Sequence, residues 1–313
     1  MISVIVIGKN EGWKLSLCFN SIINSIKRND ISSYEIIYVD AQSSDGSIEE
    51  AKKYPDIKIF SLTGRCSAAI ARNVGGKEAQ GDILFFLDGD MELQSDFIPA
   101  LFNFKGELIH PFISGINCHY FYDDNWRFLY MKSLPQIQIN VFKKWTGGFF
   151  IIKKELWLTI GGMDARLGAN EDLDLGLRLS KKGSFVLKIA KVGVIHHTIE
   201  NMESSKIWKK LVLYRFPAIL VRKHLFMNRY YTPIFFRMNY SAVLLFISLV
   251  FQFLFPISVI GYLCVIIART LRHGVIKNLK IFPYFVCRDI LFIGSIFLFF
   301  PSQPKINYEN IKN

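Results

Sequence analysis

Cysteine is scarce in this chain: five cysteines are scattered over 313 residues, and none of them forms a CxxC pair. An odd and dispersed set argues against a disulfide scaffold and a cysteine-based zinc site, and it favours a reducing compartment. The N-terminus also lacks the basic segment and long apolar run of a signal peptide. We therefore expect residues 2–7 to form a first strand.

Acidic residues are missing from one part of the chain. The net charge is +12, which taken alone suggests a nucleic-acid partner. Residues 1–203 are nearly neutral, however, and most of the excess lies in residues 204–240 and 269–280, which contain Lys and Arg but no Asp or Glu. These two basic segments flank the most apolar stretches, residues 241–268 and 281–300. This distribution is typical of a membrane-binding protein and argues against a nucleic-acid partner.

The sequence predicts three parts. They are a globular domain at residues 1–203, a basic amphipathic interfacial segment at 204–240, and a hydrophobic region at 241–313 that ends in a short polar tail. About 200 residues suffice for one domain with a substantial core. We expect the last two parts to form a helical, membrane-associated C-terminal region.

The topology of the hydrophobic region stays open at this stage. Residues 241–268 carry no charge, and residues 281–300 carry only the adjacent Arg288 and Asp289, so both are candidate membrane segments. If both span, the two basic segments lie on opposite sides of the bilayer, which the positive-inside rule disfavours. If Pro256 instead marks the tip of a re-entrant hairpin, each arm is too short to cross.

Residues 1–110 alternate between strand and helix patterns. We expect strands at residues 2–7, 34–39, 57–60 and 83–87, and helices at 13–26, 47–54 and 67–79. Farther along, we expect helices at 155–160 and 172–182 and closing strands at 185–189 and 192–195. Continuous apolar strands separated by helices predict an α/β domain with a mostly parallel sheet. Such sheets bind ligands beyond the carboxyl ends of their strands.

Two carboxylates follow the last of the early strands, in Asp88-Gly89-Asp90. The strand brings their oxygens to the edge of the sheet, and Gly89 permits a tight turn and close approach of a ligand. Carboxylate oxygens suit Mg²⁺ or Mn²⁺, which in turn bind phosphates. The alternative is a turn in which the Asp side chains cap the next element.

A second acidic residue, Asp40, ends the strand at residues 34–39. At that position a carboxylate can accept hydrogen bonds from a ribose or a base. The residues that follow have a simpler interpretation: Asp45-Gly46 is typical of a turn, and Ser47 of a helix N-cap.

A third motif, residues 170–179, begins a helix with three acids in four residues. The helix dipole explains part of this pattern, and Asp174 and Arg178 have the i, i+4 spacing of an ion pair. Closely spaced leucines indicate a well-buried helix. Carboxylates at the head of such a helix tend to have a perturbed pKa, which suits the general base of an enzyme.

Taken together, the motifs resemble those of glycosyltransferase family 2, whose members have the GT-A fold. The segments SVIVIGKNE, VDAQSSDGS, ARNVGG, AQGDILFFLDGD, TGGFF and NEDLDLGLRL occur in the order seen in that family. The resemblance covers roughly residues 2–200. It implies inverting transfer of a sugar from a nucleotide-diphosphate donor, with Mg²⁺ or Mn²⁺ as the cofactor.

The resemblance also implies site residues. Asp88 and Asp90 would be the metal-binding DxD motif, Asp172 of the Glu171–Asp172 pair the base, and Glu11, Asp40, Arg72, Asp82 and Asp88 the donor-nucleotide site. The chain departs from the family's pattern at Ala41, where many relatives have a second Asp, and at Lys9, where many have an aromatic residue. The donor base is therefore left open.

Several further residues are candidates with structural alternatives. His196 and His197 follow the last expected strand, and in similar enzymes a late His completes the metal shell. Both also suit a surface or structural role. Gly147 and Gly148 can shape an acceptor site with Trp145, although a strand start and an aromatic core explain them equally well.

The resulting hypothesis is a glycosyltransferase at the plasma membrane, with its catalytic domain on the cytoplasmic side. The donor is a nucleotide sugar, and the acceptor is a lipid-linked glycan of cell-surface polysaccharide or glycoconjugate synthesis. Polyprenyl phosphate is the alternative acceptor. A nucleotidyltransferase is a weaker alternative, because the glycine-rich, basic loop expected after the first strand is absent.

Overall fold

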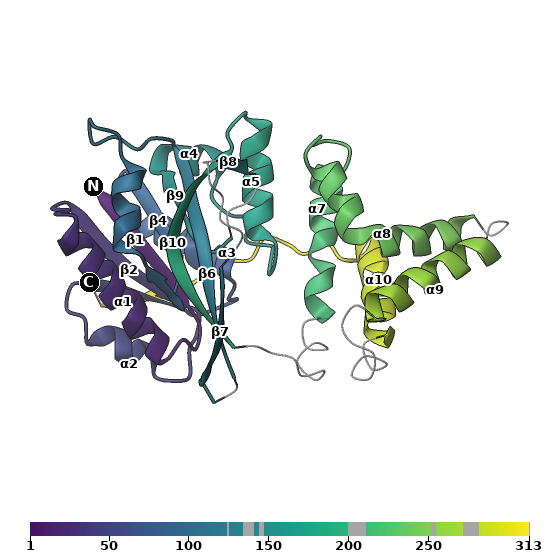
Figure 1. Cartoon of the computed structure of the whole chain (residues 1–313), viewed down its shortest axis with the longest axis horizontal. Helices are drawn as coiled ribbons and strands as arrows, with labels where there is room; N and C mark the ends of the chain where they lie inside the picture. The colour runs from purple at the N-terminus through teal and green to yellow at the C-terminus, as the bar shows by residue number, and fades with distance from the viewer. Residues whose placement is uncertain are drawn as a thin grey trace. The chain divides into compact units, whose positions relative to one another are not determined.

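The computed structural model describes residues 1–123, 125–133, 141–143, 147–199, 211–251, 255–271 and 282–312 (Figure 1). The chain divides into two compact units. The first unit contains Met1–Glu200 and Gln303–Asn313, and the second contains Asn201–Ser302.

The first unit is a mixed sheet with helices on both faces. Its strands are β1 (Ile2–Gly8), β2 (Tyr34–Asp40), β3 (Ile57–Leu62), β4 (Ile83–Asp88), β5 (Met91–Leu93), β6 (Phe112–Tyr122), β7 (Phe128–Ser133), β8 (Val141–Lys143), β9 (Phe150–Lys153), β10 (Val186–Ile199) and β11 (Tyr308–Lys312). Its helices are α1 (Trp13–Arg28), α2 (Ser47–Lys52), α3 (Ala68–Glu78), the 3₁₀ helix η1 (Ser95–Leu101), α4 (Lys154–Ile160) and α5 (Glu171–Lys181).

The main strands lie in the order β11-β3-β2-β1-β4-β9-β6-β10-β5, with β7 beside β6 and β8 beside β10. Strands β3, β2, β1 and β4 run parallel, as the alternation of strand and helix patterns predicts. β9 is antiparallel to both β4 and β6, so the sheet is mixed beyond β4. The predicted α/β class is confirmed.

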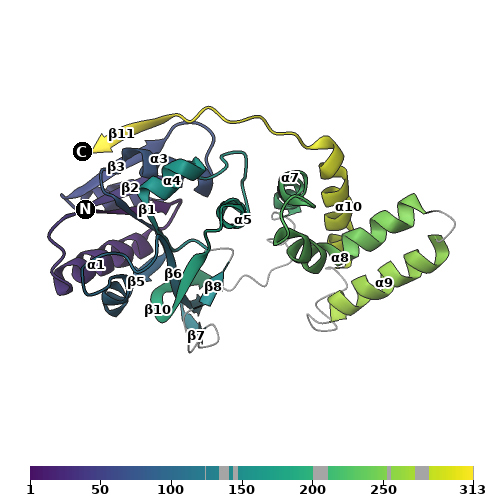
Figure 2. The same cartoon turned by 90° about the horizontal axis from the view of Figure 1, so that it is seen from above.

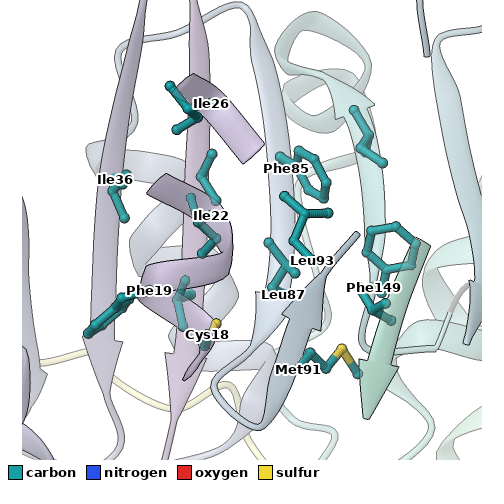
Figure 3. Close-up of a cluster of buried hydrophobic side chains, with 14 of the residues drawn as sticks. Cys18, Phe19, Ile22, Ile26, Ile36, Phe85, Leu87, Met91, Leu93 and Phe149 are labelled. Carbon is teal, nitrogen blue, oxygen red and sulfur yellow. The ribbon is translucent and has the colours of Figure 1, made fainter. Parts of the chain in front are cut away.

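The sheet is covered on both faces because successive strand residues point to opposite sides. On one face, Phe85 and Leu87 of β4 pack with Phe19 of α1 in a buried cluster (Figure 3). On the other face, Leu84 and Phe86 pack in a second cluster with residues of α3, α4 and α5. Alternate side chains of β4 thus pack into the two clusters on opposite faces of the sheet. Asp88, the last residue of the strand, lies beyond both clusters.

Two predictions about the end of the domain are corrected. The expected strands at 185–189 and 192–195 form one strand, β10, whose pairing with β6 shifts register between Lys188 and Val194. The bulge interrupts the apolar alternation, so the sequence pattern resembles two strands. The polar tail belongs to the first unit and not to the hydrophobic region, because β11 pairs antiparallel with β3 and forms the edge of the sheet (Figure 2).

The second unit is helical: η2 (Leu211–Arg215), α7 (Pro217–His224), α8 (Tyr231–Val250), α9 (Phe255–Leu271) and α10 (Phe282–Leu298). The apolar stretch 241–268 is therefore not one helix. α8 ends at Val250, and α9 starts with Pro256 in its first turn, where the missing N–H of proline costs nothing. Within the described residues, α8 has the length and apolarity of a membrane span, and 22% of its most apolar window is buried.

Candidate active site

The carboxyl ends of three parallel strands create a cavity. Gly8 of β1 lies in register with Asp40 of β2, and Ile7 with Asp88 of β4. The cavity at this edge measures about 200 Å³ and is lined by Ile7, Gly8, Lys9, Glu11, Ala41, Ala68, Ala71, Asp88 and Asp90. A cavity therefore lies at the carboxyl ends of the strands, the sheet edge at which the sequence predicts a ligand site.

The turn after β4 places two carboxylates at this cavity. Gly89 donates its N–H to the carbonyl of Ile7 at 2.8 Å, so the pairing of β4 with its neighbour β1 continues up to this turn. Burial raises the pKa of Asp88 to about 6, although the nearby Arg72 guanidinium opposes the rise. A carboxylate held in this way favours a cationic partner, because a cation restores the charged form.

Arg72 of α3 joins that turn to the head of α5. Its Nη2 donates to Asp88 Oδ1 at 2.6 Å, and its Nη1 donates to Glu171 Oε1 at 2.9 Å. The Arg72 side chain is only 2% exposed. Burial opposes the charge of Arg72, but the two carboxylates raise its pKa above the ordinary value. The guanidinium fork is thus a fixed positive centre between two motifs that are distant in sequence.

Asp172, the predicted general base, lies beside this centre. Its Oδ1 accepts from the N–H of Leu173 at 2.8 Å, and its Oδ2 accepts from the N–H of Gly147 at 3.1 Å. Burial and the neighbouring Glu171 carboxylate raise the pKa of Asp172. A raised pKa makes a carboxylate a better proton acceptor near neutral pH. The predicted pair of Asp174 with Arg178 is confirmed at 2.7 Å.

The Gly147-Gly148 pair allows backbone to approach both carboxylates. Gly147 has φ +77°, a left-handed conformation that favours glycine. A Cβ on Gly148 would lie 1.9 Å from Asp88 Oδ2, so only glycine fits there without displacing that side chain. The third acceptor-site candidate, Trp145, lies outside the described residues.

His196 faces the second carboxylate of the turn. Its Nε2 lies 2.9 Å from Asp90 Oδ2. Burial works against the charged forms of both groups, but their mutual attraction raises the pKa of His196 and lowers that of Asp90. The other oxygen, Asp90 Oδ1, is buried without a hydrogen-bond partner.

The donor set fits a divalent cation in chemistry. Oxygens from Asp88 and Asp90 and the imidazole of His196 are ligands that Mg²⁺ or Mn²⁺ accepts, and the orphaned Asp90 Oδ1 has a vacant coordination direction. In the described part of the chain, no three such side chains are already gathered closely enough to hold an ion. The side chains therefore have to converge when a cation binds.

His197 takes a different role from its neighbour. Its Nε2 lies 2.9 Å from Glu92 Oε2, and its Nδ1 lies 2.7 Å from the hydroxyl of Tyr122. Adjacent strand residues point to opposite faces, so both histidines cannot reach Asp90. The structure separates the two metal candidates and places only His196 beside the acidic turn.

Glu11 and Asp90 share a cation that the sequence pattern does not reveal. Lys14 Nζ lies 2.6 Å from Glu11 Oε2 and 3.8 Å from Asp90 Oδ2, and its side chain is 9% exposed. Burial and the charge of Asp90 raise the pKa of Glu11. The i, i+3 spacing of Glu11 and Lys14 is visible in the sequence, but nothing there indicates a buried lysine.

Two expected nucleotide-binding residues are placed differently from the rest. Asp40 is fully buried, and its oxygens accept from the Tyr38 hydroxyl at 3.0 Å and from the N–H of Ser43 at 2.9 Å. It supports the loop that carries the cavity residue Ala41. Asp82 precedes β4, is 90% exposed and pairs with the N-terminal amine at 3.4 Å. The start and end of one strand lie at opposite edges of the sheet, so Asp82 is not brought to the cavity.

Comparison with known proteins adds independent information. A family model described as glycosyl transferase family 2 matches residues 3–162. The chain is 27% identical over 237 residues to N-acetylgalactosaminyltransferase 6 of Drosophila melanogaster, covering 65% of this chain and 35% of that protein. It is 30% identical over 200 residues to an uncharacterized glycosyltransferase of Haemophilus influenzae, covering 59% and 64%. The chain thus spans less than two thirds of either relative.

Two solved structures share the fold. A crystal structure of GalNAc-T7 with UDP, GalNAc and Mn²⁺ superposes with a TM-score of 0.53 at 18% identity, over 70% of this chain and 50% of that one. S. aureus TarS 1–349 superposes with a TM-score of 0.50 at 16% identity, over 70% and 64%. The family model covers half of this chain, and strands β2 to β9 and the acidic turn lie within the match. The chain therefore belongs to glycosyltransferase family 2 and has the GT-A fold.

Proposed function

We propose that this enzyme transfers a sugar, with inversion, from a nucleotide-diphosphate donor to a hydroxyl of a lipid-linked glycan in cell-surface polysaccharide or glycoconjugate synthesis. The observation that carries the proposal is the buried Arg72 fork, which lies 2.6 Å from Asp88 and 2.9 Å from Glu171. It couples the acidic turn to the helix that bears Asp172. The related crystal structure with UDP and Mn²⁺ supports the donor class.

The donor side uses the strand-end cavity. Asp88, Asp90 and His196 would hold Mg²⁺ or Mn²⁺, which when bound supplies positive charge to the departing diphosphate. Glu11 and Lys9 line the same cavity, in which the nucleoside of the donor would lie. Arg72 keeps Asp88 in its charged form by offsetting part of the cost of burial. The predicted nucleoside contacts of Glu11 and Asp40 stay predictions.

The acceptor side uses Asp172. Its carboxylate takes the proton from the acceptor hydroxyl while that oxygen attacks the sugar carbon from the face opposite the departing diphosphate. A single displacement of this kind inverts the configuration and needs no enzyme nucleophile. The N–H of Gly147 orients the Asp172 carboxylate at 3.1 Å, and burial keeps its pKa above that of an ordinary aspartate.

The location follows from the charge. Residues 204–240 hold eight basic side chains and no acidic one, which favours an anionic leaflet. We place the enzyme at the plasma membrane with its first unit on the cytoplasmic side. A lipid-linked acceptor would then be held close to the enzyme by the same surface.

The test is turnover by the detergent-purified full chain. Nucleotide sugars are screened with Mn²⁺ for release of nucleoside diphosphate, and the accepted donor is then supplied with lipid-linked glycans. Asp172→Asn should lower transfer by about 10²–10⁴-fold, the range for loss of a general base. Asp96→Asn, at a residue 68% exposed in a surface ion pair, is the matched control.

The outcomes separate the alternatives. Full activity of Asp172→Asn with every donor would contradict the mechanism. A sugar linked directly to a lipid phosphate would make polyprenyl phosphate the acceptor, whereas an extended glycan supports the proposal.

A further inference from the structure

The last residues of the chain tie the second unit back to the first. β11 pairs with β3 (Figure 2). The Tyr308 hydroxyl donates to Glu78 Oε1 at 2.5 Å, and Lys312 Nζ donates to the carbonyl of Tyr54 at 2.6 Å. Both ends of the second unit are therefore attached to one globular unit. A chain that leaves and re-enters the same side crosses a bilayer an even number of times, and three spanning helices are excluded.

Helices α8, α9 and α10 share one polar layer, in which Ser241, Arg288 and Asp289 are buried. The hydroxyl of Ser241 in α8 accepts from Arg269 Nη1 of α9 at 2.7 Å and from Arg288 Nη2 of α10 at 3.0 Å. Arg288 also donates to Asp289 Oδ1 at 2.6 Å. We call this set the polar layer; it consists of Ser241, Arg269, Arg288 and Asp289. Its charged groups lie at one level of the helix bundle, where an ion pair and hydrogen bonds offset part of the cost of burying them.

Beyond the polar layer, the α8–α9 pair is apolar and short. Residues 242–250 and 255–268 carry no charge. At 1.5 Å per residue they rise about 14 Å and about 21 Å, whereas the hydrocarbon core of a bilayer is about 30 Å thick. α8 reaches 20 residues only by including Arg237 and the non-helical Asn239 (φ −123°, ψ 20°). The uncharged arms are therefore too short to cross.

The connection between the arms also favours a tip that stays in lipid. Residues 251–255 read Phe-Gln-Phe-Leu-Phe, with no charge to meet water on a far side. The described side chains next to this connection are exposed: Leu249 is 55% exposed, Val250 53% and Ile257 75%. Exposed apolar side chains gathered at one end of a helix pair suit an acyl-chain environment.

We propose that α8 and α9 form a re-entrant hairpin that enters one leaflet and returns without crossing. The polar layer then lies at the membrane interface, and the basic segments 204–240 and 269–280 both meet the anionic headgroups of that leaflet, on the side of the first unit. This inference rests on one part of the proposed function, namely that the acceptor lies at a membrane. It removes the conflict with the positive-inside rule, because no basic segment is translocated.

Depth-dependent quenching tests the hairpin in the full chain. Two variants are prepared, Phe251→Trp at the tip and Tyr240→Trp at the polar layer. Each is reconstituted in vesicles of equal parts phosphatidylglycerol and phosphatidylcholine. The lipid acyl chains carry bromine either near the headgroup or near their ends. Fluorescence is compared with that of the wild type. We expect deep bromines to quench the tip tryptophan more strongly and shallow bromines to quench the Tyr240→Trp variant more strongly. Stronger shallow quenching at both positions would mean a spanning hairpin and overturn the proposal, as would quenching at neither.

A second measurement needs no substitution. Trypsin added outside sealed vesicles, to which the protein has bound from outside, should cleave in both basic segments. Protection of residues 269–280 alone would overturn the proposal. Donor turnover of the same preparations separates the two claims, because a failed depth pattern with intact transfer refutes only the hairpin, whereas absent transfer refutes the proposed function.

Discussion

Replacing Arg72 by Met removes the buried cation that two partly buried carboxylates share. The arginine is 2% exposed, and its partners Asp88 and Glu171 are 29% and 15% exposed. Met keeps the apolar stem of the arginine side chain but removes the guanidinium, so neither acid keeps it as a counter-charge. We expect the variant to lose both stability and transfer.

The magnitude follows from the geometry. Removing one partner of a buried ion pair costs about 3–5 kcal/mol. Asp88 can avoid carrying an unpaired charge by taking up a proton. Because its pKa is about 6 with Arg72 present, protonating it at pH 7 costs at most about 1.4 kcal/mol, which limits its contribution to the loss of stability. We therefore expect the lower end, about 3 kcal/mol. For a unit of this size, that lowers Tm by roughly 6–12 °C.

The loss should depend on pH. Without Arg72, the pKa of Asp88 in the folded state rises further above its value in the unfolded state. Between these two pKa values the folded state binds the proton more tightly than the unfolded state does. The free energy of unfolding therefore falls as the pH rises through this range. The difference in Tm between variant and wild type should be smaller at about pH 5 than at about pH 8.

Thermal unfolding by circular dichroism at both pH values measures this. Arg28→Met is the control, because Arg28 and Asp96 form an ion pair at 3.3 Å with side chains 70% and 68% exposed, and such pairs contribute about 1 kcal/mol or less. An Arg72→Met variant as stable as Arg28→Met at both pH values would refute the argument that the fork compensates buried charge.

Three further predictions concern the chemistry. Gly148→Ala should lower transfer by about 10²-fold, because its Cβ would lie 1.9 Å from Asp88 Oδ2; donor-turnover rates measure this, and wild-type rates would contradict it. His196→Gln should weaken Mn²⁺ binding by roughly 10-fold, because its Nε2 lies 2.9 Å from Asp90 Oδ2; calorimetric titration with UDP present checks it, and an unchanged affinity would remove His196 from the metal site. The acid limb of the kcat/KM profile should lie above the ordinary aspartate pKa of about 4, because burial raises the pKa of Asp172; a limb at about 4 would contradict its role as base.

Much of the site could be predicted because parallel strands carry their last residues to one edge. Asp88 follows a continuous apolar strand, and that pattern is sufficient to place it at the sheet edge. Asp82 belongs to the same motif but precedes the strand, and six residues at about 3.3 Å each separate the two edges by about 20 Å. A linear motif does not distinguish the two ends of a strand.

Other site residues have no sequence signal that identifies them. Lys14 is one of many basic side chains, and only the packing around Glu11 and Asp90 makes it a buried cation. The pairing of His197 with Glu92 and Tyr122 joins β10, β5 and β6, which are far apart in the chain. Burial and partner choice are properties of the assembled sheet.

The sequence by itself determined the α/β class, the sheet edge at which the cavity lies, and the confinement of the +12 charge to the C-terminal third. These depend on local periodicity and composition, which a linear chain displays directly. Only the tertiary structure decided that Arg72 contacts both Asp88 and Glu171, although Glu171 is 99 positions from Arg72 in the sequence. The structure also decided that the polar tail returns to β3. The physical reason is that long-range pairs depend on strand order, and no local pattern encodes which distant segments become neighbours.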